Sequence, residues 1–172
     1  SRARELHDSL WGMLPLLRLK LGGTASKDET LRLLDTTHTE LRRISHHLMP
    51  EELLRGGLVS ALRDFARSVP GAAFQTYGDI RLSKEWELTL YRCAFELVNN
   101  AMKYAEATHI DIQLIQTVHE VTLTVSDNGK GMGDGNGMGL QNIRERIEPY
   151  HGTLRIVSGE NEGTEINITL PL

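Results

Sequence analysis

The chain has 172 residues, of which 40% are hydrophobic and 24% are charged, a composition typical of a soluble globular protein with a real core. Its net charge of −4 gives no electrostatic basis for binding nucleic acid, and no apolar run approaches the roughly 18 residues that a membrane span needs. Its single cysteine, Cys93, excludes internal disulfides and is compatible with a reducing cytosol. We therefore expect these residues to be cytoplasmic and without membrane contact, with a membrane anchor elsewhere in a full-length protein as an open alternative. The charged pattern that opens at Ser1, without a methionine, favours a fragment of a longer protein.

Residues 1–50 show two amphipathic helical patterns separated by a short turn. Leucines recur every three or four residues over positions 1–21, and every seven residues from about 28 to 48. The segment between them, "GGTASKDE", contains residue types that end one helix and cap the next. One hairpin cannot bury both apolar stripes, so we expect two copies to dimerise into a four-helix bundle.

Strands and helices alternate in the rest of the chain. Residues 51–72 are expected to form a connecting segment with a short helix, "GLVSALRDFARSV". Over residues 73–172, strand-like alternation occurs in "AAFQTYG", "THIDIQLIQT", "EVTLTVSD", "GTLRIVS" and "GTEINITLPL". Helical patterns cover residues 84–105, with an apolar side running from Leu88 to Met102, and "LQNIRERIEPY". This order predicts an α+β fold with helices on one face of a mixed sheet.

A glycine-rich loop joins the strand that ends at Asp127 to the helix that begins near Leu140. Glycine occupies every odd position from Gly129 to Gly139. This spacing fits neither the dinucleotide-binding fingerprint nor the P-loop. A flexible linker is the alternative, but both flanking elements belong to one predicted sandwich, which favours a functional loop inside a domain.

The two ends of this loop suit different parts of a nucleotide. Asp127 can accept hydrogen bonds from an adenine amino group, or it can simply initiate an Asx turn. Gly129 and Gly131 would let the backbone approach a flat ring closely. Gly137 and Gly139 would lie at a helix N-terminus, where free N–H groups and the helix dipole favour phosphate.

The long helix carries a polar stripe outside its apolar side. At about 100° per residue, Glu96, Asn100 and Lys103 fall within roughly 60° of one another. An acid, an amide oxygen and a cation suit Mg²⁺ and a polyphosphate, because Mg²⁺ takes few protein oxygens and shares phosphate oxygens. A solvated helix face is the alternative, although asparagine in the middle of a helix is a poor helix former and favours a functional reason.

Four segments resemble a known family. "ELVNNAMKYA", "DNGKGM", "GMGL" and "GTE" are similar to the N, G1, G2 and G3 boxes of the ATP-binding domain of sensor histidine kinases. That domain has the Bergerat (GHKL) fold shared with gyrase, Hsp90 and MutL. The resemblance implies that Asn100 binds Mg²⁺, that Lys103 contacts phosphate, and that Glu96 positions water or the metal. It also implies that Asp127 binds the adenine, supported by Thr164.

The first part of the chain extends the resemblance. "RELHDSL" and "HLMPEELLRGGLVSALRDFA" are similar to the phosphoacceptor hairpin of the NarL/DesK-like subfamily. This implies that His7 is the phosphoacceptor and that Asp8 is the base acting on its ring proton. An imidazole with its ordinary pKa of about 6.5 is a competent nucleophile at neutral pH. Gly12 stands where the subfamily usually has a glutamine, so we expect weak or absent glutamine-type phosphatase activity.

Taken with the resemblance, the sequence predicts a homodimeric, Mg²⁺- and ATP-dependent protein histidine kinase that signals to the receiver domain of a response regulator. Residues 1–50 would form the phosphoacceptor hairpin and residues 73–172 the catalytic domain. The glycine loop would be a short ATP lid whose contacts lie in Asp127–Gly131 and Gly137–Leu140. The alternatives are a non-catalytic, ATP-responsive dimeric interaction module and an ATPase clamp, although a clamp would not need the histidine-bearing hairpin.

Overall fold

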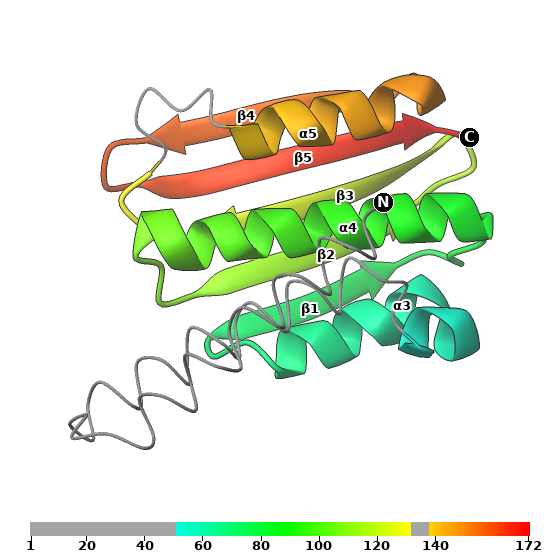
Figure 1. The fold of residues 1–172 in the computed structure, drawn as a ribbon, viewed down its shortest axis with the longest axis horizontal. Helices are drawn as coiled ribbons and strands as arrows, with labels where there is room; N and C mark the ends of the chain where they lie inside the picture. Colours follow the sequence, from blue (N-terminus) through cyan, green and yellow to red (C-terminus); the bar gives the residue numbers. More distant parts are fainter. Residues whose placement is uncertain (1–50, 132–137) are drawn as a thin grey trace, which may run out of the picture. The chain divides into compact units, whose positions relative to one another are not determined.

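The computed structural model describes residues 51–131 and 138–172. The hairpin expected over residues 1–50 and the middle of the glycine loop lie outside these residues. Within the described part, five strands form one sheet, and three helices pack on one side of it (Figure 1). This is the α+β arrangement with a mixed sheet that the sequence predicts.

The strands coincide with the alternating segments of the sequence. They are β1 (Ala72–Tyr77), β2 (Ile110–Gln116), β3 (Glu120–Asp127), β4 (Thr153–Gly159) and β5 (Gly163–Pro171). Their order in the sheet is β1-β2-β3-β5-β4, with β1 parallel to β2 and every other pair antiparallel. The helix-facing side chains are mostly apolar and buried. The opposite face is polar, with Thr122 and Thr169 hydroxyls 3.1 Å apart, as expected of a sheet covered on one face only.

Helix α3 (Glu51–Arg67) belongs to the core of this unit, although the sequence suggests only a connecting role for it. Its buried residues are Leu53, Leu58, Ala61, Leu62, Phe65 and Ala66. The helix bends at Gly57, whose φ of 74° is accessible to glycine at little cost. The bend frees the Leu58 N–H, which donates to the buried Glu87 carboxylate at 3.3 Å.

Helix α4 (Lys84–Asn100) begins at Ser83, whose hydroxyl accepts a hydrogen bond from the Trp86 N–H at 3.3 Å. Its α-helical pattern ends at Asn100 and continues as one π-helical turn, Ala101–Ala105. A π turn bonds i→i+5 rather than i→i+4, so it rotates the following side chains away from the apolar side. Met102 is accordingly 46% exposed, and its predicted place on the apolar side is wrong.

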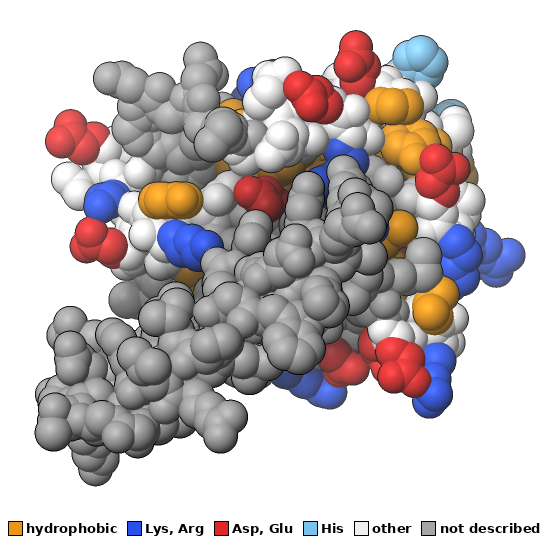
Figure 2. Space-filling view, in the orientation of Figure 1, with side chains coloured by type: hydrophobic (Ala, Val, Ile, Leu, Met, Phe, Trp, Pro, Cys, Tyr) orange, Lys and Arg blue, Asp and Glu red, His pale blue; other side chains and the backbone are white. Residues whose placement is uncertain are grey.

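Helix α5 (Met138–Ile147) follows the glycine loop and is continued by a short 3-10 turn, Glu148–Tyr150. Ile143 and Ile147 are fully buried against the sheet and α4. Acidic and basic side chains are interspersed over the visible helix side of the molecule (Figure 2). None of the described helices is long and apolar enough to cross a membrane.

Candidate functional site

One end of the sheet brings together residues that are far apart in the sequence. Strands β3 and β4 end there, and β2 and β5 begin there, because antiparallel neighbours place the end of one strand beside the start of the next. Helix α4 ends and α5 begins at the same edge, at the left in Figure 1. The described candidate residues lie on these ends.

The helix-facing side of the sheet changes from apolar to polar at this edge. Asp127 is the direct partner of Thr164, and Thr164 is the partner of Ser158. Residues opposite one another point to the same face, so these three side chains form one polar row across β3, β5 and β4. The next row inward is apolar and consists of Val125, Ile166 and Ile156. We call Asp127, Thr164 and Ser158 the polar row.

The side chains of the polar row are held in place locally. Asp127 Oδ1 accepts a hydrogen bond from the Gly129 N–H at 2.9 Å, which is the Asx turn that the sequence left open. The other carboxylate oxygen, Oδ2, has no hydrogen-bond partner among the described residues. Thr164 is 5% exposed, and its hydroxyl lies 3.2 Å from Ser158 Oγ. Gly163, with a φ of 82°, packs against the backbone carbonyl of Asp127, where a Cβ would collide.

The first part of the glycine loop is fixed between two elements. Gly129 packs so closely on Ala105 that a Cβ would collide with its backbone, and the Lys130 N–H donates to the Ala105 carbonyl at 2.9 Å. Gly131, with a φ of 84°, packs in the same way on the backbone of Gly159. The loop therefore starts wedged between the π turn and the β4–β5 hairpin, and its glycines are needed for that fit.

Two polar residues of this loop have structural contacts. Asn128 Oδ1 accepts hydrogen bonds from the N–H groups of Thr108 and His109, at 3.0 and 2.8 Å. Lys130 Nζ lies 2.8 Å from Glu106 Oε1, and this hydrogen bond and charge hold the pKa of Glu106 below its usual value. Both ionic side chains are exposed, so this pair orients the loop more than it stabilises the fold.

Helix α5 touches the polar stripe of α4 at Gly139. A Cβ at this position would lie 2.9 Å from both Glu96 Oε1 and Asn100 Nδ2, so the absence of a side chain leaves room for these groups. Leu140, the next residue, is buried and anchors the start of α5 in the core. Lys103 lies within the π turn, is exposed, and forms no ion pair with another described residue.

Cys93 and Arg146 lie in the same α4–α5 interface. Burial raises the pKa of the Cys93 thiol from 9.0 to about 11, opposed by the charge of Arg146 and its hydrogen bond, with Glu96 adding to the rise. The thiol is therefore neutral near pH 7 and is no candidate nucleophile.

The donor groups at this edge suit a magnesium–polyphosphate. Glu96 offers a carboxylate and Asn100 an amide oxygen, both beside a glycine at a helix start, where backbone N–H groups favour phosphate. No group of three or more His, Cys, Asp or Glu residues in the described ranges is placed to hold a metal ion by itself. An ion at Asn100 would thus share its coordination with phosphate oxygens, as Mg²⁺ commonly does.

Three predicted site residues lie outside the described part of the chain, and two residues beside the polar site were not predicted. The predicted His7, Asp8 and Gly137 lie outside the described residues. Sequence analysis overlooked Ser158 and Gly163. Strand parity could have indicated Ser158, because it continues the inward-facing alternation of β4, but only the pairing register shows that it meets Thr164.

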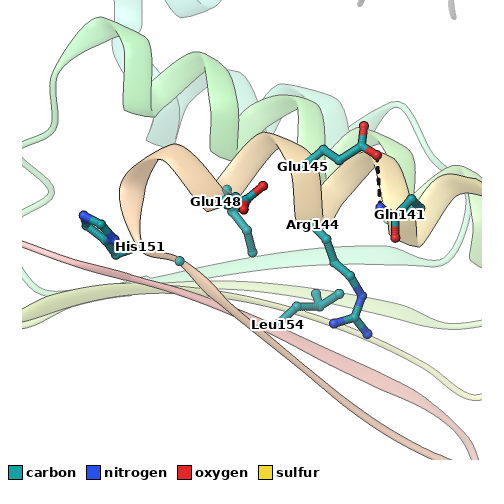
Figure 3. Close-up of a pocket in the computed structure, with 8 residues that line it drawn as sticks. Gln141, Arg144, Glu145, Glu148, His151 and Leu154 are labelled. Carbon is teal, nitrogen blue, oxygen red and sulfur yellow. Dashed lines mark hydrogen bonds between the residues drawn. The ribbon is translucent and has the colours of Figure 1, made fainter.

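A separate hollow of about 570 Å³ lies on the outer side of α5 (Figure 3). Its walls include Gln141, Arg144, Glu145, Glu148, His151 and Leu154, and the Gln141 amide donates to Glu145 at 3.0 Å. Leu154 lies near the start of β4, whereas Ser158 lies near its end. The hollow thus reaches the other end of β4, and none of the predicted site residues lines it.

A protein family and a solved structure with a similar fold match this chain. Residues 86–172 match the family described as "Histidine kinase-, DNA gyrase B-, and HSP90-like ATPase". The histidine kinase domain of a blue-light activated histidine kinase from Erythrobacter litoralis superposes with a TM-score of 0.59 at 19% identity, covering 95% of this chain and 84% of that domain. At this identity the similarity concerns the fold.

Sequence relatives extend over nearly the whole chain. The sensor protein VraS of Staphylococcus haemolyticus is 28% identical, with 99% of this chain and 54% of that protein covered. VraS of Staphylococcus aureus strain COL is 27% identical with the same coverage. The chain therefore spans about half the length of the curated relatives it matches.

Proposed function

Because the chain belongs to the histidine kinase-, DNA gyrase B- and HSP90-like ATPase family, we propose that it is the kinase core of a two-component sensor histidine kinase of the NarL/DesK-like subfamily. In this proposal it binds ATP, phosphorylates its own His7 and passes the phosphoryl group to an aspartate of a response regulator. The similarity to VraS sensor proteins, which covers 99% of the chain, supports a kinase core of this kind.

The observation that carries the proposal is the meeting of α4 and α5 at Gly139. There Glu96 and Asn100 face a glycine at a helix start, at the same edge of the sheet where Asp127 pairs with Thr164. The first group of residues suits phosphate and a metal ion, and the second suits the hydrogen-bond donors of a base. ATP needs both kinds of contact at once.

Each proposed contact follows from the chemistry of its residue. Asn100 would hold Mg²⁺, whose charge offsets that of the phosphates, Glu96 would position the metal or a water, and Lys103 would contact phosphate. Asp127 would accept a hydrogen bond from the adenine amino group, with Thr164 beside it. The remaining contacts would come from the two ends of the lid, at Gly129, Gly131, Gly137, Gly139 and Leu140.

The proposed reaction consists of two phosphoryl transfers, the first of them to His7. A ring nitrogen of His7 forms the new bond to the γ-phosphorus as the bond to the β–γ bridging oxygen breaks and ADP leaves. Asp8 accepts the proton of the other ring nitrogen. In the second step the N–P bond breaks and an aspartate oxygen of the response regulator forms the new bond. Dimerisation through the hairpin of residues 1–50 would present His7 to the nucleotide.

Labelling with γ-phosphate-labelled ATP and Mg²⁺ tests the proposal. We expect an acid-labile, base-stable label that is lost in His7→Gln and kept in His46→Gln, a matched substitution in the same hairpin. ATP binding without any label, under conditions in which a known histidine kinase is labelled, would contradict the kinase and favour the non-catalytic interaction module. Absence of ATP binding would contradict both.

A further inference from the structure

Two oxygen atoms of β5 lie close to the hydroxyl of Ser158. Ser158 Oγ lies 3.2 Å from the Gly163 carbonyl oxygen and 3.2 Å from Thr164 Oγ1. A carbonyl oxygen can only accept, and a serine hydroxyl has one hydrogen to donate. Both contacts are satisfied when the Ser158 hydrogen goes to Gly163 and Thr164 donates to Ser158, and this is the arrangement that we adopt.

In this arrangement the Thr164 hydroxyl can only accept hydrogen bonds from other groups. Its only hydroxyl hydrogen is directed at Ser158, so its oxygen presents lone pairs to other neighbours. Thr164 is buried and its hydroxyl has no other hydrogen-bond partner among the described residues, so there is little access for water to replace that contact. Beside it, Asp127 Oδ2 is also an acceptor. This part of the row thus offers acceptors alone and suits a ligand that brings N–H donors.

We propose that Ser158 is a positioning residue that holds Thr164 as an acceptor and thereby makes the site select a purine with a 6-amino group over one with a 6-oxo group. The inference rests on the proposed function, in which Asp127 and Thr164 contact the base. An amino group has two hydrogens and can donate to both side chains. An oxo group would place an oxygen against two acceptors and would be rejected.

Removing the Ser158 hydroxyl should release this constraint. In Ser158→Ala the Thr164 hydroxyl has lost its acceptor, so it can rotate and donate to a 6-oxo group. A purely structural Ser158 would behave differently, because a loosened β4–β5 hairpin would weaken the binding of every nucleotide to the same degree. The ratio of the two affinities therefore separates a positioning role from a structural one.

The test measures dissociation constants for ATP and inosine triphosphate, each with Mg²⁺, in the full chain. We expect Ser158→Ala to reduce the preference for ATP by about three- to tenfold, the range for one neutral hydrogen bond, mainly through tighter binding of inosine triphosphate. Ser158→Thr, which keeps a hydroxyl, should retain the wild-type ratio. Ser126→Ala, on the opposite face of the sheet where its partner is Glu165, should retain it too.

A second variant covers the case in which Ser158→Ala does not fold. Thr164→Val keeps the shape of the side chain but removes its oxygen, and it should also reduce the preference for ATP. An unchanged ratio in the folded variants, with both nucleotides weakened equally or not at all, would overturn the inference while leaving the proposed function intact. A wild-type chain that binds neither nucleotide would instead contradict the proposed function.

Discussion

Gly139 is a residue at which the needs of the fold and of the site can be separated. In Gly139→Ala the new Cβ would displace the flexible ends of Glu96 and Asn100, which lie 2.9 Å from its position. Alanine favours a helix by about 1 kcal/mol over glycine, so the fold should be as stable as before or slightly more stable. We expect ATP affinity to fall by about tenfold while urea unfolding is unchanged or shifted upward. Wild-type affinity in this variant would contradict the assignment of Glu96 and Asn100 to the site.

The raised pKa of Cys93 should lower the free energy of unfolding at alkaline pH. Its pKa is raised from 9.0 to about 11 by burial, so its contribution to stability is fully present below pH 9 and is lost as the pH rises toward 11. Two pKa units correspond to about 2–3 kcal/mol in the free energy of unfolding. Cys93→Ala should remove this loss, so the variant should show a flatter stability profile between pH 8 and pH 11.

The difference between wild type and Cys93→Ala isolates the contribution of the thiol from that of Tyr150. Burial and a hydrogen bond to Glu85 also raise the pKa of Tyr150, but that contribution is present in both proteins and cancels in their difference. Parallel profiles above pH 9 would show that the thiol is not held neutral in the folded protein.

At the scale of secondary-structure elements, the bend in α3 depends on one buried carboxylate. Glu87 accepts the Leu58 N–H at 3.3 Å and an ion-paired hydrogen bond from Lys84 at 2.8 Å. Glu87→Ala leaves the N–H unpaired at the bend and should cost about 1–3 kcal/mol in urea unfolding. Glu51→Ala removes a carboxylate from an exposed pair with Arg55 and should cost less than about 1 kcal/mol. Equal losses in the two variants would show that the bend does not rely on Glu87.

The elements differ in how far the sequence could predict them. Strands are predictable because one face is buried, so β3 alternates from Val121 to Val125 and then presents Asp127 on the same side. The π turn after Asn100 was not predictable, since hydrogen-bond spacing within a helical stretch depends on tertiary contacts such as that of Ala105 with Gly129. Likewise, the role of Ser158 depends on the register of β4 with β5, which its own segment does not encode.

At the scale of the whole molecule, the candidate site is assembled from the ends of many elements. The polar row comes from three strands, the polar stripe from α4, and Gly139 from the first turn of α5. No single segment carries it, so the site should exist only when the whole unit is folded. ATP binding should therefore depend on how much of the chain belongs to the folded unit, and in particular on whether that unit needs α3.

A pair of truncations tests where the ATP-binding unit begins. The compact unit starts at Glu51, and α3 contributes Leu53, Leu58, Leu62 and Phe65 to its core. Each large buried side chain is worth roughly 1.5–3 kcal/mol, so losing four of them approaches the whole stability of a typical domain, about 5–15 kcal/mol. A chain of residues 51–172 should unfold cooperatively and bind ATP like the full chain, but it should take no phosphoryl label because it lacks His7. A chain of residues 73–172 should neither unfold cooperatively nor bind ATP. Cooperative unfolding of the shorter chain, followed by circular dichroism in urea, would show that α3 only connects the parts and does not complete the core.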